Sequence, residues 1–256
     1  MVRVRSIKHE DRLTVIEHLD ELRTRLIFAI VSFVVGFGIC FWQNHRLLDI
    51  LNKPLPGDQH PVTLGVAEPF TVTLTVAAYA GLLLALPVIL YQVYAFVLPA
   101  FSPGERRLAL PLLLMVPFLF AAGVVFGYFV VLPAAVKFLL NFNDDQFNIQ
   151  VRAREYYSFV AMTLLALGVL FQVPVGILAA TRLGITTPGQ LRRLRRHAIV
   201  VIAVVAMLLP GTDPITMLLS MVPLIILYEL SIVLAALFGR PSRESVEGPA
   251  AAEGPG

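Results

Sequence analysis

The chain is poor in the residues that a water-soluble surface or a cysteine-based site requires. Only 14% of its 256 residues are Asp, Glu, Lys or Arg, whereas 57% are hydrophobic and the mean hydropathy is +0.80. This composition does not suit a water-facing surface, so we expect lipid to be the main solvent of the chain. The single cysteine, Cys40, lies within an apolar run, which excludes a disulfide framework and a thiolate metal site.

Motifs for enzymatic or metal chemistry are also missing from the sequence. The five histidines lie far apart and lack the H-E-x-x-H spacing of a zinc site. There is neither a G-x-S-x-G elbow nor a phosphate-binding P-loop. We therefore predict no metal, no cofactor, no enzymatic activity and no nucleic acid partner. The basic start lacks the apolar core and cleavage site of a signal peptide, so the first span is expected to direct its own insertion.

Long runs without a charged residue are present instead. Four of them are long enough to cross a hydrocarbon layer of about 30 Å as helices. A fifth run spans only about 18 Å, and a sixth is interrupted by Glu229. We predict two short crossings here, with a re-entrant hairpin as the alternative. The sequence thus predicts an all-α, polytopic membrane protein with six spans, at residues 26–42, 70–101, 108–136, 156–181, 198–209 and 214–239.

The basic residues divide unequally between the two sides of these spans. One side carries 15 of the 20 Lys and Arg residues, which predicts that this side, with both termini, is cytoplasmic. Residues 1–25 form the N-terminal segment, where Thr14 and Glu17 fit the capping box of an amphipathic helix that leads into the first span. Residues 26–239 form the membrane domain, and 240–256 have the composition of a disordered cytoplasmic tail.

Prolines within the predicted spans favour bent helices. Each proline removes a helical hydrogen bond, and bent helices enclose a concave surface, although proline is also simply common in membrane helices. The four positions are Pro87, Pro117, Pro174 and Pro223.

Two carboxylates stand out at the cytoplasmic boundary. Glu21 lies four residues before Arg25, so either a local ion pair or a binding role can explain it. Glu105 precedes Arg106 and Arg107 in a short loop, where it would also suit the positive end of the following helix.

Three more polar residues lie within or beside the apolar runs. Glu229 is a functional candidate because a charge at membrane depth is costly. Its alternatives are a carboxylate near the cytoplasmic interface, or a protonated group bonded to a neighbouring helix. Gln172 lies within a span and must find a hydrogen-bond partner in another helix or a docked protein. Asp213 lies in a tight turn and is most simply a turn residue.

Several stretches, taken together, resemble the TatC family over most of the chain. They are H-L-D-E-L-R-T-R at 18–25, P-L at 54–55, P-V-I-L-Y-Q-V-Y-A-F at 87–96 with Pro99, E-R-R at 105–107, Y-F-V-V at 128–131, F-Q-V-P-V at 171–175, G-I-T at 184–186 and Asp213. The H-L-D-E-L-R stretch and the loop stretch that combines Phe96 and Pro99 with E-R-R at 105–107 are specific to the family when they occur together.

This resemblance implies a six-helix, cup-shaped receptor in a bacterial cytoplasmic membrane. It would bind twin-arginine signal peptides of folded proteins at its cytoplasmic face and export them with single-span TatA/TatB-type partners, driven by the proton motive force. Contact with membrane lipid and self-association in the complex are also implied. The residues carried over by motif are Glu21 and Glu105 as carboxylate partners, Arg23, Phe96 and Arg107 as residues that shape the site, and Pro54 and Asp213 as extracytoplasmic support.

A carboxylate site suits this function, because Arg pairs with carboxylate in a bidentate manner that Lys cannot match. The sequence departs from the family at Gln172, where many members have Glu, and at Met217, where Gln is frequent. Gln172 cannot carry a charge but can still bind a polar residue of a partner helix, whereas Met217 weakens a second polar contact. A secondary transporter or channel for a small solute, using Gln172 and Glu229, is the main alternative, and an intramembrane enzyme is a more distant one.

Overall fold

The computed structural model describes residues 15–56, 60–97, 106–146, 149–208 and 213–238. Helices make up most of this part of the chain, and its sheet-like pairing is one isolated bridge between Val62 and Arg152. The helices are α1 (Val15–Trp42), α2 (Asn44–Asn52), α3 (Glu68–Val97), α4 (Arg106–Phe126), α5 (Leu132–Asn141), α6 (Ala153–Leu170), α7 (Val173–Arg182), α8 (Pro188–Arg193), α9 (Arg195–Met207) and α10 (Pro214–Phe238), with a π-helical turn, Gly127–Val131, between α4 and α5. The predicted all-α class is confirmed.

Among the described residues, five segments are long and apolar enough to cross a membrane. They are Leu19–Trp42, Glu68–Phe96, Met115–Asn141, Ala153–Arg182 and Pro214–Leu237. The first four match the four long predicted spans. The expected short sixth crossing is wrong in its length, because α10 has 25 residues and extends for about 37 Å. Of the last two predicted crossings, only α9 is short, with 13 residues or about 20 Å. The count of six spans therefore stays a prediction.

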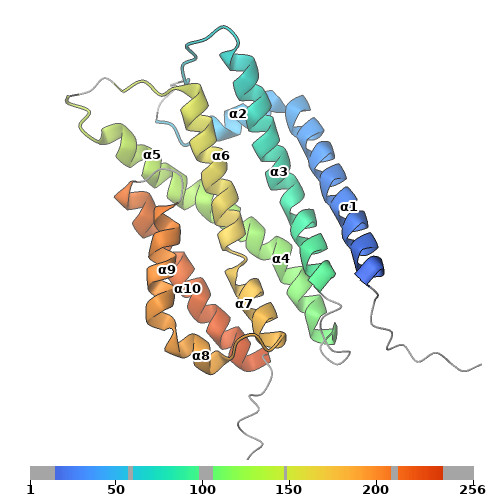
Figure 1. Cartoon of the computed structure of the whole chain (residues 1–256). Coiled ribbons are helices and arrows are strands. Elements are labelled where there is room, and N and C mark those ends of the chain that lie inside the picture. The colour runs from blue at the N-terminus through green and yellow to red at the C-terminus, as the bar shows by residue number, and fades with distance from the viewer. Residues whose placement is uncertain (1–14, 57–59, 98–105, 147–148, 209–212, 239–256) are drawn as a thin grey trace, which may run out of the picture.

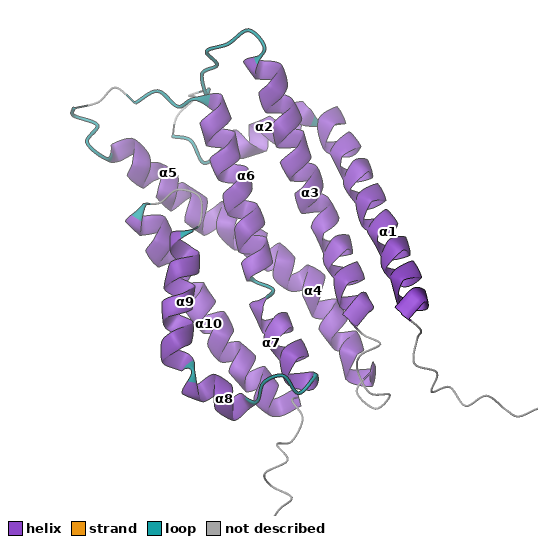
Figure 2. Cartoon of the chain, in the orientation of Figure 1, coloured by secondary structure: helices purple, strands orange, loops and turns teal. Residues whose placement is uncertain are grey.

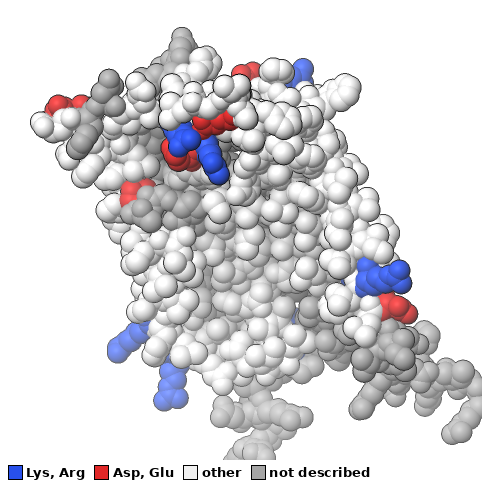
Figure 3. Space-filling view, turned by 45° about the horizontal axis from the view of Figure 1, so that its top comes forward, with Lys and Arg blue, Asp and Glu red and all other residues white. Residues whose placement is uncertain are grey.

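The long helices run side by side, with their ends gathered at two opposite ends of the molecule (Figure 1). The start of α1, the end of α3, the start of α4 and the end of α7 lie at one end, together with α8. The opposite end carries α2 and the loops that lead into α3 and α6, and Figure 2 shows how little loop lies between these ends. On the face in Figure 3, the described Lys, Arg, Asp and Glu side chains lie toward the two ends, as expected for a membrane-crossing bundle.

Helix α1 continues directly from the segment predicted to be amphipathic into the first span. Its capping residue Thr14, like residues 1–13 and the predicted tail at 240–256, lies outside the described residues. Only 6% of the most apolar window of α1 is buried, against 56% for α6 and α7, because α1 packs mainly on α3. The contact is close at Gly36 and Gly81, where a Cβ added to Gly81 would lie 2.5 Å from the backbone nitrogen of Phe37.

Prolines have different effects in different spans. Pro87 and Pro223 lie inside α3 and α10, which continue through them. Pro174 instead lies in the first turn of α7, so the bend predicted there is a break between α6 and α7. This break is consistent with the missing N–H of proline, which is tolerated at a helix start but not in a helix interior.

An apolar pocket of about 570 Å³ lies between α1, α2, α3, α4 and α6. Residues that line it include Cys40, Leu51, Leu83, Pro87, Phe120 and Leu164. This pocket gives the molecule a concave region of the kind that the prolines lead us to expect. Nearby, Leu51, Val72, Val136 and Val160 belong to a buried cluster that packs α2, α3, α5 and α6 together.

Candidate functional site

The N-terminal carboxylate of the candidate site is held by an arginine that also reaches a second helix. Arg25 on α1 donates through Nε to Glu21 Oε1 at 3.0 Å and through Nη1 to Gln92 Oε1 on α3 at 3.1 Å. The ion-paired side chains of Glu21 and Arg25 are about one quarter exposed. The local ion pair considered from the sequence is therefore present, and it joins the start of α1 to the last turns of α3.

The other residues predicted for peptide binding lie in segments that the fold brings to the same end. Arg23 is exposed on α1, and Phe96 is partly buried near the end of α3. Glu105 lies outside the described residues, and Arg107 lies in the first turn of α4, with a side chain outside the described part. The ends of α1, α3 and α4 that carry or border these residues lie close to one another in Figure 1. The structure thus places the three segments together.

Glu229 is not an isolated charge at membrane depth. Arg195 Nη2 of α9 donates to Glu229 Oε2 of α10 at 2.7 Å, and the two side chains are 49% and 45% exposed. This arrangement agrees with the interface carboxylate that the sequence left open. It also explains why α10 continues through Glu229, since the charge has a partner and lies toward the end of the helix.

Gln172 lies at the junction of α6 and α7, and only one of the two polar atoms of its side-chain amide has a hydrogen-bond partner among the described residues. The side chain is 6% exposed, and its Nε2 donates to the carbonyl oxygen of Val116 on α4 at 3.2 Å. Its Oε1 is buried and has no hydrogen-bond partner in the part of the chain that the structure describes. The predicted partner in a neighbouring helix is therefore found for the donor, whereas the acceptor is free. Met217, the second departure from the family, is partly buried on α10.

Asp213 and Pro54 both lie where the chain turns at the opposite end. Asp213 is 5% exposed and caps α10, because its Oδ1 accepts from the backbone N–H of Thr216 at 2.8 Å and its Oδ2 from the Thr216 hydroxyl. Pro54 follows α2 in a turn closed by a bond from Leu55 N to the Asn52 carbonyl at 2.9 Å. The predicted turn at 210–214 lies largely outside the described residues, so the turn role of Asp213 stays a prediction, and the structure adds the helix cap.

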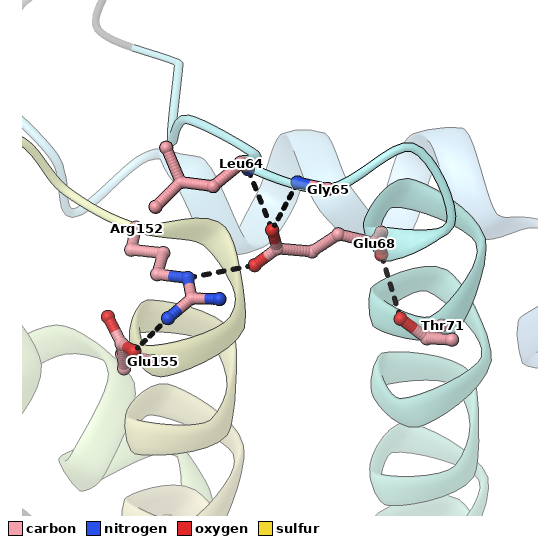
Figure 4. A network of polar contacts seen from close by, with 6 residues as sticks. All are labelled: Leu64, Gly65, Glu68, Thr71, Arg152 and Glu155. Carbon is pink, nitrogen blue, oxygen red and sulfur yellow. Dashed lines mark hydrogen bonds and ion pairs between the residues drawn. The ribbon is translucent and has the colours of Figure 1, made fainter.

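Sequence reasoning missed a network centred on Glu68 at the start of α3 (Figure 4). Glu68 Oε2 accepts from the backbone N–H groups of Leu64 and Gly65 at 2.7 and 3.1 Å, and its Oε1 accepts from Arg152 Nε at 3.0 Å. Arg152 also pairs with Glu155 at 3.1 Å. The hydrogen bond and charge of Glu68 raise the pKa of the Arg152 guanidinium above its ordinary value. The acidic residue at a helix start was the only readable signal.

Backbone pairing strengthens this link between the two loops. Val62 N donates to the Val151 carbonyl at 2.8 Å, and Ala153 N donates to the Val62 carbonyl at 2.9 Å. Together with the Glu68 ion pair, these bonds connect the start of α3 to the start of α6.

Tyrosine hydroxyls complete the same end of the molecule. Tyr128 and Tyr156 each donate at 2.7 Å to a carbonyl oxygen in the last turn of α2, at Ile50 and Leu51. Tyr157 instead donates to a side chain, at Asn52 Oδ1, with a distance of 2.9 Å. The Ile50 carbonyl also accepts from the backbone N–H of Lys53 at 3.3 Å, and the bond to the Leu51 carbonyl is buried, so the tyrosine hydroxyls add links between α2 and the segments beside it. Within the described ranges, no group of three or more His, Cys, Asp or Glu could hold a metal ion.

Comparisons with a family model, with related sequences and with solved structures all match this chain to TatC proteins. The family model for TatC, the Sec-independent protein translocase protein, matches residues 17–223. TatC of Deinococcus radiodurans is 40% identical over 242 residues, covering 91% of this chain and 90% of the relative, and TatC of Escherichia coli K12 is 37% identical over 242 residues, covering 93% and 94%. A crystal structure of the twin-arginine translocase receptor TatC superimposes with a TM-score of 0.76 at 36% identity, covering 88% of this chain and all of that one.

These matches cover both the sequence motifs and the helical arrangement. The family model begins within the first turn of α1 and ends within α10, and the solved structure has the same fold. The chain therefore belongs to the TatC family, as a multi-span membrane component of the twin-arginine protein translocase that takes part in protein transport and is not a catalytic enzyme.

Proposed function

We propose that this chain binds the twin-arginine signal peptides of folded proteins at the cytoplasmic face and nucleates their export. The observation that carries the proposal is the Glu21 carboxylate, which is held at the start of α1 by a guanidinium and remains about one quarter exposed. It lies at the end of the molecule where α3 ends and α4 begins, and Glu105 precedes α4 in the sequence.

The chemistry of recognition is an exchange of guanidinium groups. Arg25 occupies the Glu21 carboxylate in the structure, and an arginine of the peptide would take the same place. One charged hydrogen-bonded pair then replaces another, so binding is reversible and does not require a buried carboxylate to lose its partner. Lysine offers a compact ammonium without the planar fork, so we expect a lysine pair to compete less well.

The distribution of basic residues supports this orientation. Arg192, Arg193 and Arg195 lie in α8 and at the start of α9, at the same end of the molecule as the start of α1. An excess of Lys and Arg on one side is the usual sign of the cytoplasmic side. We therefore propose that both termini are cytoplasmic and that the protein resides in a bacterial cytoplasmic membrane.

The proposed partners are single-span TatA/TatB-type proteins and further copies of this chain, with the proton motive force as the energy source. Helix α1 supports the proposed partner contacts, because most of its surface is not buried within the monomer and is open to lipid or another helix.

Gln172, whose Oε1 is a buried acceptor without a partner among the described residues, is the proposed contact for a polar residue of a partner helix. A solute pathway gains no support, since Glu229 is half-exposed and paired with Arg195.

The direct test is binding of a fluorescent twin-arginine signal peptide to the purified chain in lipid nanodiscs. Wild type is compared with Glu21→Ala and Glu105→Ala, and the native peptide with its Lys-Lys version. Asp20→Ala is the matched control, because Asp20 is an exposed carboxylate on the same helix.

We expect each Glu change and the Lys-Lys peptide to weaken binding by about tenfold, the usual effect of losing a charged hydrogen bond, and the Asp20 change to have little effect. Equal affinities across the three variants and the two peptides would rule out Glu21 and Glu105 as the recognition groups.

A further inference from the structure

A polar groove lies between α3 and α6, away from the proposed peptide site. Its volume is about 340 Å³, and charged and hydroxyl-bearing side chains line much of it. They are Thr71, Thr75, Tyr79, Arg154, Tyr157 and Ser158. None of the residues predicted from the family resemblance lines this groove.

Arg154 is a cation that the protein itself does not neutralise. The carboxylates of the adjoining network, Glu68 and Glu155, are both held by Arg152. Arg154 is exposed and has no ion pair or hydrogen bond within the described part of the chain. The groove therefore has a free guanidinium at its border.

The hydroxyl groups of the groove differ in what they can still bind. Thr71 and Thr75 donate to carbonyl oxygens of their own helix, and Tyr157 donates to a side chain of α2. Tyr79 and Ser158 are partly buried, and neither has a hydrogen-bond partner in the described residues. Two hydroxyl donors thus remain available below Arg154.

The positions of Arg154 and Ser158 along the bundle match the order of polar groups in a phospholipid. Arg154 is the second residue of the candidate span Ala153–Arg182, so it lies at the membrane boundary, where lipid phosphates are found. Ser158 is one turn further along α6, and Tyr79 lies within the candidate span on α3. The depths of Arg154 and Ser158 correspond to the phosphate first and the glycerol ester oxygens below it, whereas Tyr79, about 16 Å from the start of α3, lies deeper beside the acyl chains.

We propose that this groove binds an anionic membrane phospholipid, with its phosphate paired to Arg154 and an ester oxygen accepting a hydrogen bond from Ser158. In the proposed orientation the lipid belongs to the extracytoplasmic leaflet. An anionic headgroup is favoured over a zwitterionic one, because the cation of a choline headgroup would lie close to an unneutralised guanidinium.

Native mass spectrometry of the purified full chain in detergent tests this proposal. The probes are phosphatidylglycerol and phosphatidylcholine with identical acyl chains at equal concentration, and inorganic phosphate as a competitor. The variants are Arg154→Gln, Arg154→Lys and Ser158→Ala. Arg46→Gln is the matched control, because Arg46 is an exposed arginine of α2 that does not line the groove.

We expect wild type to retain phosphatidylglycerol in preference to phosphatidylcholine. Arg154→Gln should lower phosphatidylglycerol binding by about tenfold, Ser158→Ala by about fivefold, and Arg154→Lys and Arg46→Gln by much less. Equal retention of the two lipids by wild type, or an equal loss in Arg46→Gln and Arg154→Gln, would overturn the proposal. Displacement of the lipid by inorganic phosphate at equal concentration would assign the groove to soluble phosphate instead.

Discussion

Replacing Gly81 by alanine should separate α1 from α3. The added Cβ would lie 2.5 Å from the nitrogen and 2.6 Å from the Cα of Phe37, and both are backbone atoms that cannot rotate away. Ordinary contacts between carbon atoms are about 3.5 to 4.0 Å, so the helices must move apart by roughly 1 Å. Overpacking of this kind costs about 1 to 3 kcal/mol, which corresponds to a roughly 5- to 150-fold change in an equilibrium constant.

The effect is large enough to measure because α3 provides most of the packing surface for α1. We expect Gly81→Ala to lower the free energy of unfolding in nanodiscs. It should also weaken signal-peptide binding, since α1 carries Glu21 and its bond from Arg25, which also reaches α3.

Gly38→Ala is the matched control, because a Cβ at Gly38 meets nothing within 4 Å. This control should be neutral or slightly stabilising, as alanine is the better helix former by about 1 kcal/mol. If the Gly81 and Gly38 variants had the same stability, the close packing of α1 on α3 could not be what holds α1 in place.

Two further predictions concern buried polar groups. Asp213→Ala should destabilise the protein by about 1 kcal/mol through loss of the cap on α10. Asp213→Asn should retain most of that stability, because the Asn side-chain oxygen can still accept from the backbone N–H of Thr216. Thermal unfolding of both variants distinguishes capping from a need for charge. Gln172→Met should leave stability equal to or higher than that of wild type while reducing co-purification of single-span partners, because it removes a buried acceptor whose desolvation costs about 1 to 3 kcal/mol. A marked loss of stability in Gln172→Met would show that the bond to Val116 matters more than the unpaired Oε1.

The four long spans were predictable because each is a run without charge that exceeds the membrane thickness. Helix α2 was missed, because Arg46 and Asp49 give this short segment the appearance of a loop. Its Leu47, Leu48 and Leu51 do recur at helical spacing, so the signal was present. The sixth crossing was expected to be short because Glu229 interrupts the run at 214–239, and the partner of Glu229, Arg195, could not be identified from the sequence.

The site was predictable only where local motifs specify it. Glu21 and its pairing with Arg25 follow from a spacing of four residues on one helix. The contact of Glu68 with Arg152 joins positions 84 residues apart, and no periodicity or motif connects them. The same limit applies to Gln92, which contacts Arg25 only because α1 and α3 pack together.

The π-helical turn at Gly127–Val131 marks a place where the length of this protein can change during evolution. A π-turn contains one residue more than the α-helical turn that it replaces, so it accommodates an inserted residue without rotating the helix on either side. Removing one residue from this turn would leave α4 and α5 with their present faces toward the core. The same deletion within α5 would rotate every later residue of that helix by about 100°. Relatives with a shorter third span are therefore expected to have a regular α-helix here and to differ in the hydroxyl bond that Tyr128 makes to α2.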